Sequence, residues 1–234
     1  MRDFKRRLIP ALVLLLALPA VLPAAKKAPS FEYLTVEQRN FDFPPPPAAG
    51  SPEYKADFDL LREWEKKRTP EQCAEADAEA HATFDEFFGK MSPLPNPLPR
   101  RAAKIVKRMG REASASVWVL KDRFNRPRPF HTDAELHPCL GRIGGLAYPS
   151  GHATLSRMYA LILSELAPER RAEFIARADE AALFRIIGGV HHPSDIEAGK
   201  RLAESVFAMC MKNPAFVKDM ETLRGYIKKP VAAR

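Results

Sequence analysis

The stretch PSGHATLSRMYALILSELAPERRAEFIARADEAALFRIIGGVHHPSD (149–195) decides the fold class of this chain. Apolar residues recur in it at helical spacing over 151–166 and over 168–187, and another helical pattern starts at Pro193. Neither long pattern shows the strict alternation of a half-buried strand. The stretch therefore predicts consecutive helices joined by short turns.

Helical patterns extend outward in both directions from this stretch. Thr69-Pro70-Glu71-Gln72 combines a helix cap, a proline at the first helical position and a glutamine at the third, and Gly89 ends the pattern that follows. The other patterns cover 101–123, 193–211 and 214–228, and convincing strands are absent from the sequence. We therefore expect an all-α, single-domain bundle of six or seven helices, with its active site at helix ends and in loops.

The first 25 residues have the layout of a secretory signal peptide. Four basic residues precede an apolar run from Leu8 to Leu22, which ends in small residues near Ala24-Ala25. A membrane anchor is the alternative, but the run is shorter than the roughly 20 residues of a spanning helix and contains prolines. We expect cleavage, a periplasmic or secreted protein, and no stable membrane insertion afterwards.

The remaining residues suffice for one substantial domain. Residues 26–55 are rich in proline and are expected to be extended, either over the domain or loose in solvent, and 56–234 form the helical domain. The formal charge without residues 1–25 is +5, which suits anionic small molecules, and no basic run with interleaved aromatics suggests nucleic acid. Cys73, Cys139 and Cys210 allow one disulfide, whose pairing the sequence leaves open.

Lys121 and Arg128 bracket a loop just beyond a predicted helix end. Arginine binds phosphate oxygens through a planar fork, and lysine supplies a compact charge. Pro127 and Pro129 keep the backbone around Arg128 extended. The alternative is a solvated basic loop, since charge runs usually face water.

Pro149-Ser150-Gly151-His152 precedes a helix. A small residue and a glycine at a helix start let backbone N–H groups approach an anion, and the helix dipole favours negative charge there. The alternative is that Ser150 is an ordinary helix cap.

The segment Arg185 to Asp195 contains a cation, a histidine and a carboxylate. Gly188-Gly189 interrupts the helix, which allows a close approach to some other group. Asp195, four residues after His191, can anchor one ring nitrogen and leave the other unprotonated and nucleophilic. The alternatives are a structural role for Asp195 at a helix terminus and a satisfied buried His191. His192 is expected to point elsewhere.

Together these motifs resemble the type 2 phosphatidic acid phosphatase superfamily, and within it the class A bacterial non-specific acid phosphatases. The family pattern KxxxxxxRP, PSGH, SRxxxxxHxxxD matches KDRFNRPRP (121–129), PSGH (149–152) and RIIGGVHHPSD (185–195). FPPPP (43–47) and NPAF (213–216) also resemble the soluble class A enzymes. Phe184 replaces the family's serine before Arg185, so a hydroxyl that could orient this arginine is missing.

The resemblance implies a metal-independent acid phosphatase of broad specificity for phosphate monoesters. It implies that His191 attacks phosphorus, that Asp195 holds its ring, and that His152 protonates the leaving group and then activates water. The phosphate-binding groups it implies are Lys121, Arg128, Ser150, Gly151 and Arg185. No carboxylate cluster suited to Mg²⁺ or Ca²⁺ accompanies the motifs, so we expect neither metal nor cofactor. Soluble relatives suggest a homo-oligomer.

Three other functions fit parts of this pattern. A vanadium-dependent haloperoxidase would use the same anion pocket, since vanadate mimics phosphate. A lipid-phosphate or pyrophosphate phosphatase is the alternative within the enzyme class, although membrane members of the superfamily have several spanning segments. A catalytically silent phosphate receptor would not need two histidines and Asp195. The sequence does not identify the physiological substrate.

Overall fold

The computed structural model describes residues 31–227, so the predicted signal peptide lies outside the described part. The described residues are helical and contain no strand, which confirms the all-α prediction. Two long helices, α4 (Arg100–Phe124) and α6 (Gly151–Leu166), form the middle of the bundle together with α7 (Arg171–Ile187) and α8 (Pro193–Cys210). The predicted bounds of these helices are confirmed to within a few residues.

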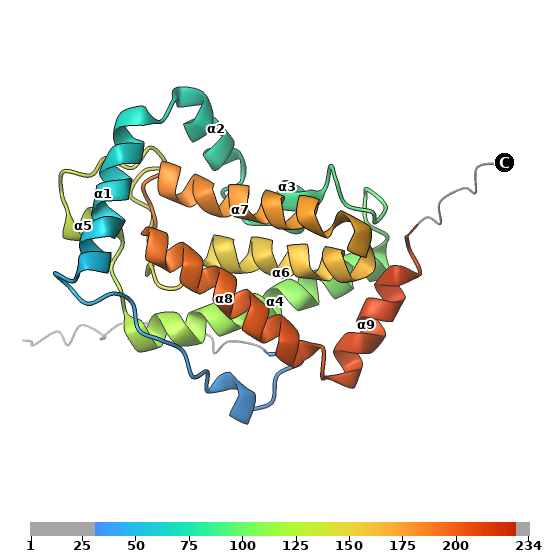
Figure 1. Ribbon diagram of the computed structural model, residues 1–234. Helices are drawn as coiled ribbons and strands as arrows, with labels where there is room; N and C mark the ends of the chain where they lie inside the picture. Colours follow the sequence, from blue (N-terminus) through green and yellow to red (C-terminus); the bar gives the residue numbers. More distant parts are fainter. Residues whose placement is uncertain (1–30, 228–234) are drawn as a thin grey trace, which may run out of the picture.

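Helix α6 lies at the centre and contacts α4, α7 and α8 (Figure 1). Its side chains are buried nearly all round, for example Met158, Ala160 and Leu163, each with no exposed surface. A helix that is apolar on every side is stable only inside a core. The neighbouring helices supply that core, and α9 (Pro214–Arg224) closes one end of it against α4 and α6.

Helix α1 (Pro52–Lys67) was not predicted. It begins four residues inside the segment expected to be extended, because the Ser51 side chain accepts a hydrogen bond from Tyr54 N and Pro52 occupies the first turn. Its buried residues are Asp57, Phe58 and Leu61. The remaining short elements are α5 (Pro129–Thr132) and two 3₁₀ turns, Glu37–Arg39 and Pro168–Arg170.

The single helix expected from Thr69 to Gly89 is two helices, α2 (Pro70–Ala78) and α3 (Phe84–Phe88). The Thr69 capping box is present as predicted, but a second capping box, made by Thr83 and Glu86, starts α3. Between them Ala82 has a φ of 54°, which a continuing helix does not allow. The break places residues 79–83 over the start of α6.

The N-terminal segment 31–50 runs over the outside of the bundle toward α1 (Figure 1). The buried Glu112 carboxylate on α4 accepts hydrogen bonds from the backbone N–H groups of Glu32, Tyr33 and Leu34. Asn213, at the start of α9, donates to Tyr33 O at 2.6 Å. This segment therefore packs over the domain through bonds to two helices.

A disulfide joins Cys73 on α2 to Cys139, and Cys210 is free and buried. The bridge holds residues 136–141 against the turn after α7. At that turn Gly189 has a φ of +75°, and a Cβ there would lie 2.9 Å from Pro138 Cα. The close approach expected at the two glycines is therefore made by the protein's own loop. Among the described residues no helix is both long and apolar enough to span a membrane.

Candidate active site

Four helix ends meet at the end of the bundle where α1 and α5 lie (Figure 1). They are the C-terminal ends of α4 and α7 and the N-terminal ends of α6 and α8. The three motifs occupy these ends and the loops between them, as predicted. The structure thus brings all eight candidate residues to one region. Three of them, Lys121, Arg128 and Arg185, are within electrostatic reach of one another.

His191 is buried, with 2% of its surface exposed. Its Nδ1 lies 3.3 Å from Asp195 Oδ2, and its Nε2 lies 3.1 Å from Arg128 Nη1. Because arginine can only donate, Nε2 must accept, and the ring proton is therefore on Nδ1, facing the carboxylate. Burial lowers the pKa of His191 well below its usual range. The side chain is a neutral imidazole with an unprotonated Nε2 facing the cations.

Asp195 is fully buried in the first turn of α8. Burial alone would raise its pKa, but hydrogen bonds from His191 and His192 lower the pKa well below its usual range. His192 donates its backbone N–H at 2.8 Å, and its Nδ1 lies 2.9 Å from the same Oδ2 atom. The expectation that His192 points elsewhere is therefore wrong. It shares the carboxylate with His191, because as the residue before α8 it forms the helix cap with Asp195.

Arg128 and Lys121 are both buried. Arg128 donates to the backbone oxygens of Gly144 and Val190, at 3.0 and 2.8 Å, which fixes the guanidinium beside His191. Lys121 donates to Leu146 O. Burial, and then the charge of Arg128, lowers the pKa of Lys121 to about 7. The solvated-loop alternative for these two cations is therefore wrong.

Arg185 has 3% of its surface exposed, and its Nε and Nη1 have no hydrogen-bond partner among the described residues. Burial, and then the charge of Arg128, lowers its pKa to about 10. Buried polar groups are nearly always hydrogen-bonded in folded proteins. Two unsatisfied N–H donors beside two other cations are therefore suited to an anionic ligand.

Ser150 caps α6 by accepting from Ala153 N at 3.4 Å, and its own N–H donates to Asp195 O at 2.9 Å. These bonds join the starts of α6 and α8. Gly151 is the first residue of α6, where a Cβ would find only Val117 within 4 Å. The helix cap expected as the alternative role of Ser150 is present, and the positive end of the helix dipole lies at this site.

His152 lies in the first turn of α6, and its Nε2 is 3.0 Å from Glu79 O. Since a carbonyl oxygen only accepts, Nε2 carries the proton. Burial, and then the charges of Arg185 and Arg128, lowers the pKa of His152 to about 3. With no anion in the site this histidine is therefore neutral at mildly acidic pH.

Comparisons with known proteins identify the family of this chain. The model of the PAP2 superfamily matches residues 111–217, a range that contains all three motifs. A non-specific acid phosphatase of Salmonella typhimurium is 33% identical over 200 residues, which cover 79% of this chain and 78% of the relative. The chain belongs to the PAP2 superfamily.

The chain is also similar to a second bacterial acid phosphatase and to a solved structure. An acid phosphatase of Zymomonas mobilis is 31% identical over 198 residues, covering 79% of this chain and 74% of the relative. Among solved structures, a bacterial vanadium-dependent iodoperoxidase has a TM-score of 0.58 at 21% identity, covering 75% of this chain and 53% of the other. That likeness concerns the fold alone.

The sequence analysis missed two members of the site, Arg126 and Asp57. Arg126, inside the first motif, is 7% exposed and donates to Asp195 Oδ1 at 2.6 Å and to Asp57 Oδ2 at 2.9 Å. Asp57, on α1, also accepts from Ser194 N at 2.8 Å. Arg126 lies within the first motif, so its position in the sequence could have identified it as a site residue. Asp57 lies 138 residues from Asp195, and no sequence signal links the two.

Phe184 lies where the family has serine. It is 9% exposed and packs with Ala76 on α2 and Ile187. The aromatic ring thus forms part of the contact between α7 and α2 and provides no hydrogen bond to Arg185. Within residues 31–227, no group of three or more histidine, cysteine or acidic side chains is placed to hold a metal ion.

Proposed function

We propose that this protein is an exported acid phosphatase that hydrolyses phosphate monoesters of broad specificity through a phosphohistidine at His191, without a metal. That it is a phosphatase of the PAP2 superfamily rests on relatives named acid phosphatase at about 30% identity over most of the chain. The observation that carries the mechanism is the orientation of His191, with Nδ1 on Asp195 and an unprotonated Nε2 facing Arg128.

In the first step, His191 Nε2 forms a bond to phosphorus as the bond from phosphorus to the alcohol oxygen breaks. The positive charge that develops on the ring is stabilised by Asp195. Lys121, Arg128 and Arg185 bind the equatorial oxygens, where the negative charge of the transition state is spread. The departing oxygen receives its proton from His152.

In the second step, a water molecule replaces His191 at phosphorus. His152, now neutral, takes a proton from that water as the P–N bond breaks, and inorganic phosphate leaves. The same side chain thus serves as acid and then as base. The three cations supply the charge stabilisation that a divalent ion supplies in other phosphotransfer enzymes.

Hydrolysis of p-nitrophenyl phosphate by the purified protein tests this proposal. We expect turnover in excess chelator, a phosphoenzyme that is acid-labile and alkali-stable, and loss of both in His191→Ala. His131→Ala, which removes an exposed histidine, is the matched control and should retain activity. Loss of activity in chelator with recovery on adding Mg²⁺ or Zn²⁺, or a phosphoenzyme trapped in His191→Ala, would refute the mechanism.

Export is supported by the signal-like residues 1–25, which lie outside the described part, and by the Cys73–Cys139 disulfide, since such bridges persist mainly in oxidising compartments. Fractionation of cells that express the full chain tests it: the mature protein should be in the periplasm or medium. Retention of the uncleaved chain in the membrane fraction would favour the anchor instead.

A further inference from the structure

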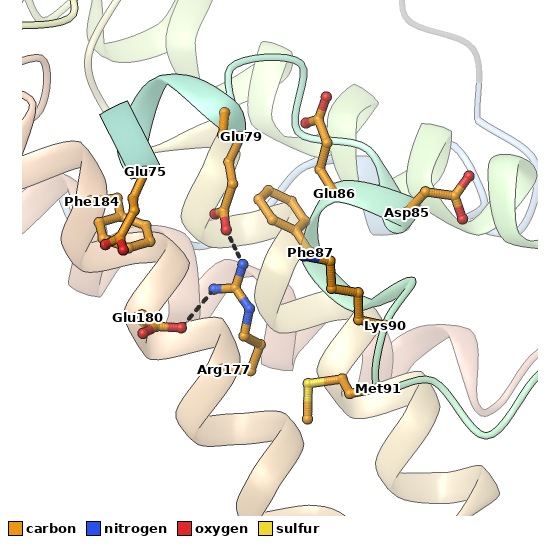
Figure 2. A pocket seen from close by; sticks show the side chains of 11 residues that line it. Glu75, Glu79, Asp85, Glu86, Phe87, Lys90, Met91, Arg177, Glu180 and Phe184 are labelled. Carbon is orange, nitrogen blue, oxygen red and sulfur yellow. Dashed lines mark hydrogen bonds and ion pairs between the residues drawn. The ribbon is translucent and has the colours of Figure 1, made fainter. Parts of the chain in front are cut away.

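A cavity of about 590 Å³ lies between α2, α3 and α7 (Figure 2). It is lined by Glu75, Ala78, Glu79, Asp85, Glu86, Phe87, Lys90, Met91, Arg177, Glu180 and Phe184. Five of these side chains are carboxylates and two are cations, so carboxylates are in excess by three. The volume falls within the usual range for small-molecule sites.

Three lining residues connect this cavity to the phosphate site. The Glu79 carbonyl accepts the His152 Nε2 hydrogen bond at 3.0 Å. The ring centroids of Phe87 and His152 are 6.1 Å apart, and Phe184 directly precedes Arg185. In the proposed mechanism the alcohol oxygen of a monoester is directed to His152, which contacts Glu79 and Phe87 of this cavity.

Glu79 distinguishes the cavity from an ordinary acidic surface. It is 8% exposed, pairs through Oε1 with Arg177, and has a buried Oε2 with no hydrogen-bond partner among the described residues. Figure 2 shows Arg177 between Glu79 and Glu180, to which it also donates at 3.1 Å. The positive charge of Arg177 is thus matched by two carboxylates. Glu86 accepts from Thr83 N and lies 3.0 Å from His81 Nδ1, which leaves Glu75 and Asp85 against Lys90.

We propose that this cavity is the leaving-group site and that it selects phosphate monoesters of alcohols carrying an ammonium or quaternary ammonium group. The inference rests on the proposed phosphatase function. The carboxylates attract the cation of such an alcohol. A second negative charge on the alcohol is repelled, so carboxylated and polyphosphorylated alcohols are poor substrates.

Three esters that differ mainly in charge test the proposal: choline phosphate, its neutral isostere 3,3-dimethylbutyl phosphate, and 2-carboxyethyl phosphate. We expect kcat/KM to be highest for choline phosphate, intermediate for the neutral isostere and lowest for 2-carboxyethyl phosphate. Each carboxylate about 7 Å from the charge on the alcohol should change kcat/KM by about threefold in a water-like dielectric. The preference should shrink as salt is added, because screening weakens exposed charges.

The matched variants are Glu75→Gln and Glu75→Lys in the cavity and Glu165→Gln, an exposed carboxylate on α6 outside it. Glu75→Gln should lower the ratio of kcat/KM for choline phosphate to that for its neutral isostere by about threefold, and Glu75→Lys should lower it further. Glu165→Gln should keep both the wild-type activity on p-nitrophenyl phosphate and the wild-type ratio. Equal rates for the three esters, or a ratio insensitive to Glu75, overturns the leaving-group site while the phosphatase function stands.

Calorimetric binding of choline phosphate and its isostere to His191→Ala gives a readout that does not depend on turnover. Tighter binding of choline phosphate supports the site, and equal binding overturns it. Absence of hydrolysis of every ester, p-nitrophenyl phosphate included, overturns the proposed function itself.

Discussion

Binding of a dianion should load a proton onto His152. The pKa of this histidine is lowered to about 3 by burial and by the charges of Arg185 and Arg128. A general acid with that pKa is protonated in only about one molecule in a hundred at pH 5. The cations that lower its pKa are those we propose to bind phosphate. An anion among them offsets their effect and favours the charged ring.

The expected shift is large enough to measure. Raising the pKa from about 3 to above 6 requires about 4 kcal/mol, since one pKa unit corresponds to about 1.4 kcal/mol. Two unit charges about 4 Å apart interact by about 4 kcal/mol at an effective dielectric of about 20, and a dianion carries two charges. Sulfate binding at pH 5 should therefore be accompanied by uptake of close to one proton.

Sulfate is the suitable probe because it remains a dianion throughout this pH range, so any proton taken up binds to the protein and not to the ligand. Calorimetric titration at pH 5 in two buffers of different ionisation enthalpy gives the number taken up, with ionic strength held constant by chloride. Lys121, with a pKa of about 7, is already charged there. His152→Gln should bind sulfate without uptake. No uptake in the wild type, or the same uptake in His152→Gln, would refute the reasoning.

Three further predictions concern the scaffold around the site. Arg126→Gln leaves Asp195 and Asp57 without their shared cation. It should lower kcat and reduce the free energy of unfolding by about 3 kcal/mol. Unchanged kcat and stability would show that Arg126 has no role in the site. The double variant Cys73→Ala with Cys139→Ala removes the disulfide. Because the bridge spans 66 residues, the free energy of unfolding measured in urea should fall by about 4 kcal/mol. Cys210→Ala should change kcat little. Gly189→Ala should reduce the free energy of unfolding by at least about 1 kcal/mol, because alanine disfavours a φ of +75° and its Cβ would clash with Pro138. An unchanged midpoint of urea unfolding would contradict this.

The sequence predicted the starts of α6 and α8 well because their signals are local. The start of α6 at Gly151 and of α8 at Pro193 follow from a capping serine and a proline in the first turn, which act within one helical turn. The eight candidate residues lie at helix ends, as predicted, because their motifs interrupt apolar periodicity. Interactions within one helical turn thus explain where these helices begin and why the motifs lie at their ends.

What the sequence analysis missed depends mostly on distant contacts or on competition between neighbouring signals. The pairing of Asp57 with Arg126 joins α1 to the first motif, and only the folded chain brings the two together. The break between α2 and α3 had a local signal in Thr83 and Glu86, but the apolar spacing across 73–88 suggested one continuous helix. The resulting loop brings the Glu79 carbonyl oxygen to 3.0 Å from His152 Nε2.

The protonation state of His152 also shows why a residue inventory is not sufficient to describe this mechanism. Three cations, two histidines and a carboxylate suggest groups that all assist one reaction. In the folded protein the cations oppose protonation of His152, and its one ring proton is donated to the Glu79 carbonyl. An anion that neutralises the cations removes the first of these conditions. If His152 is the general acid proposed above, we expect it to become a proton donor when substrate binds, which would couple general acid catalysis to phosphate binding.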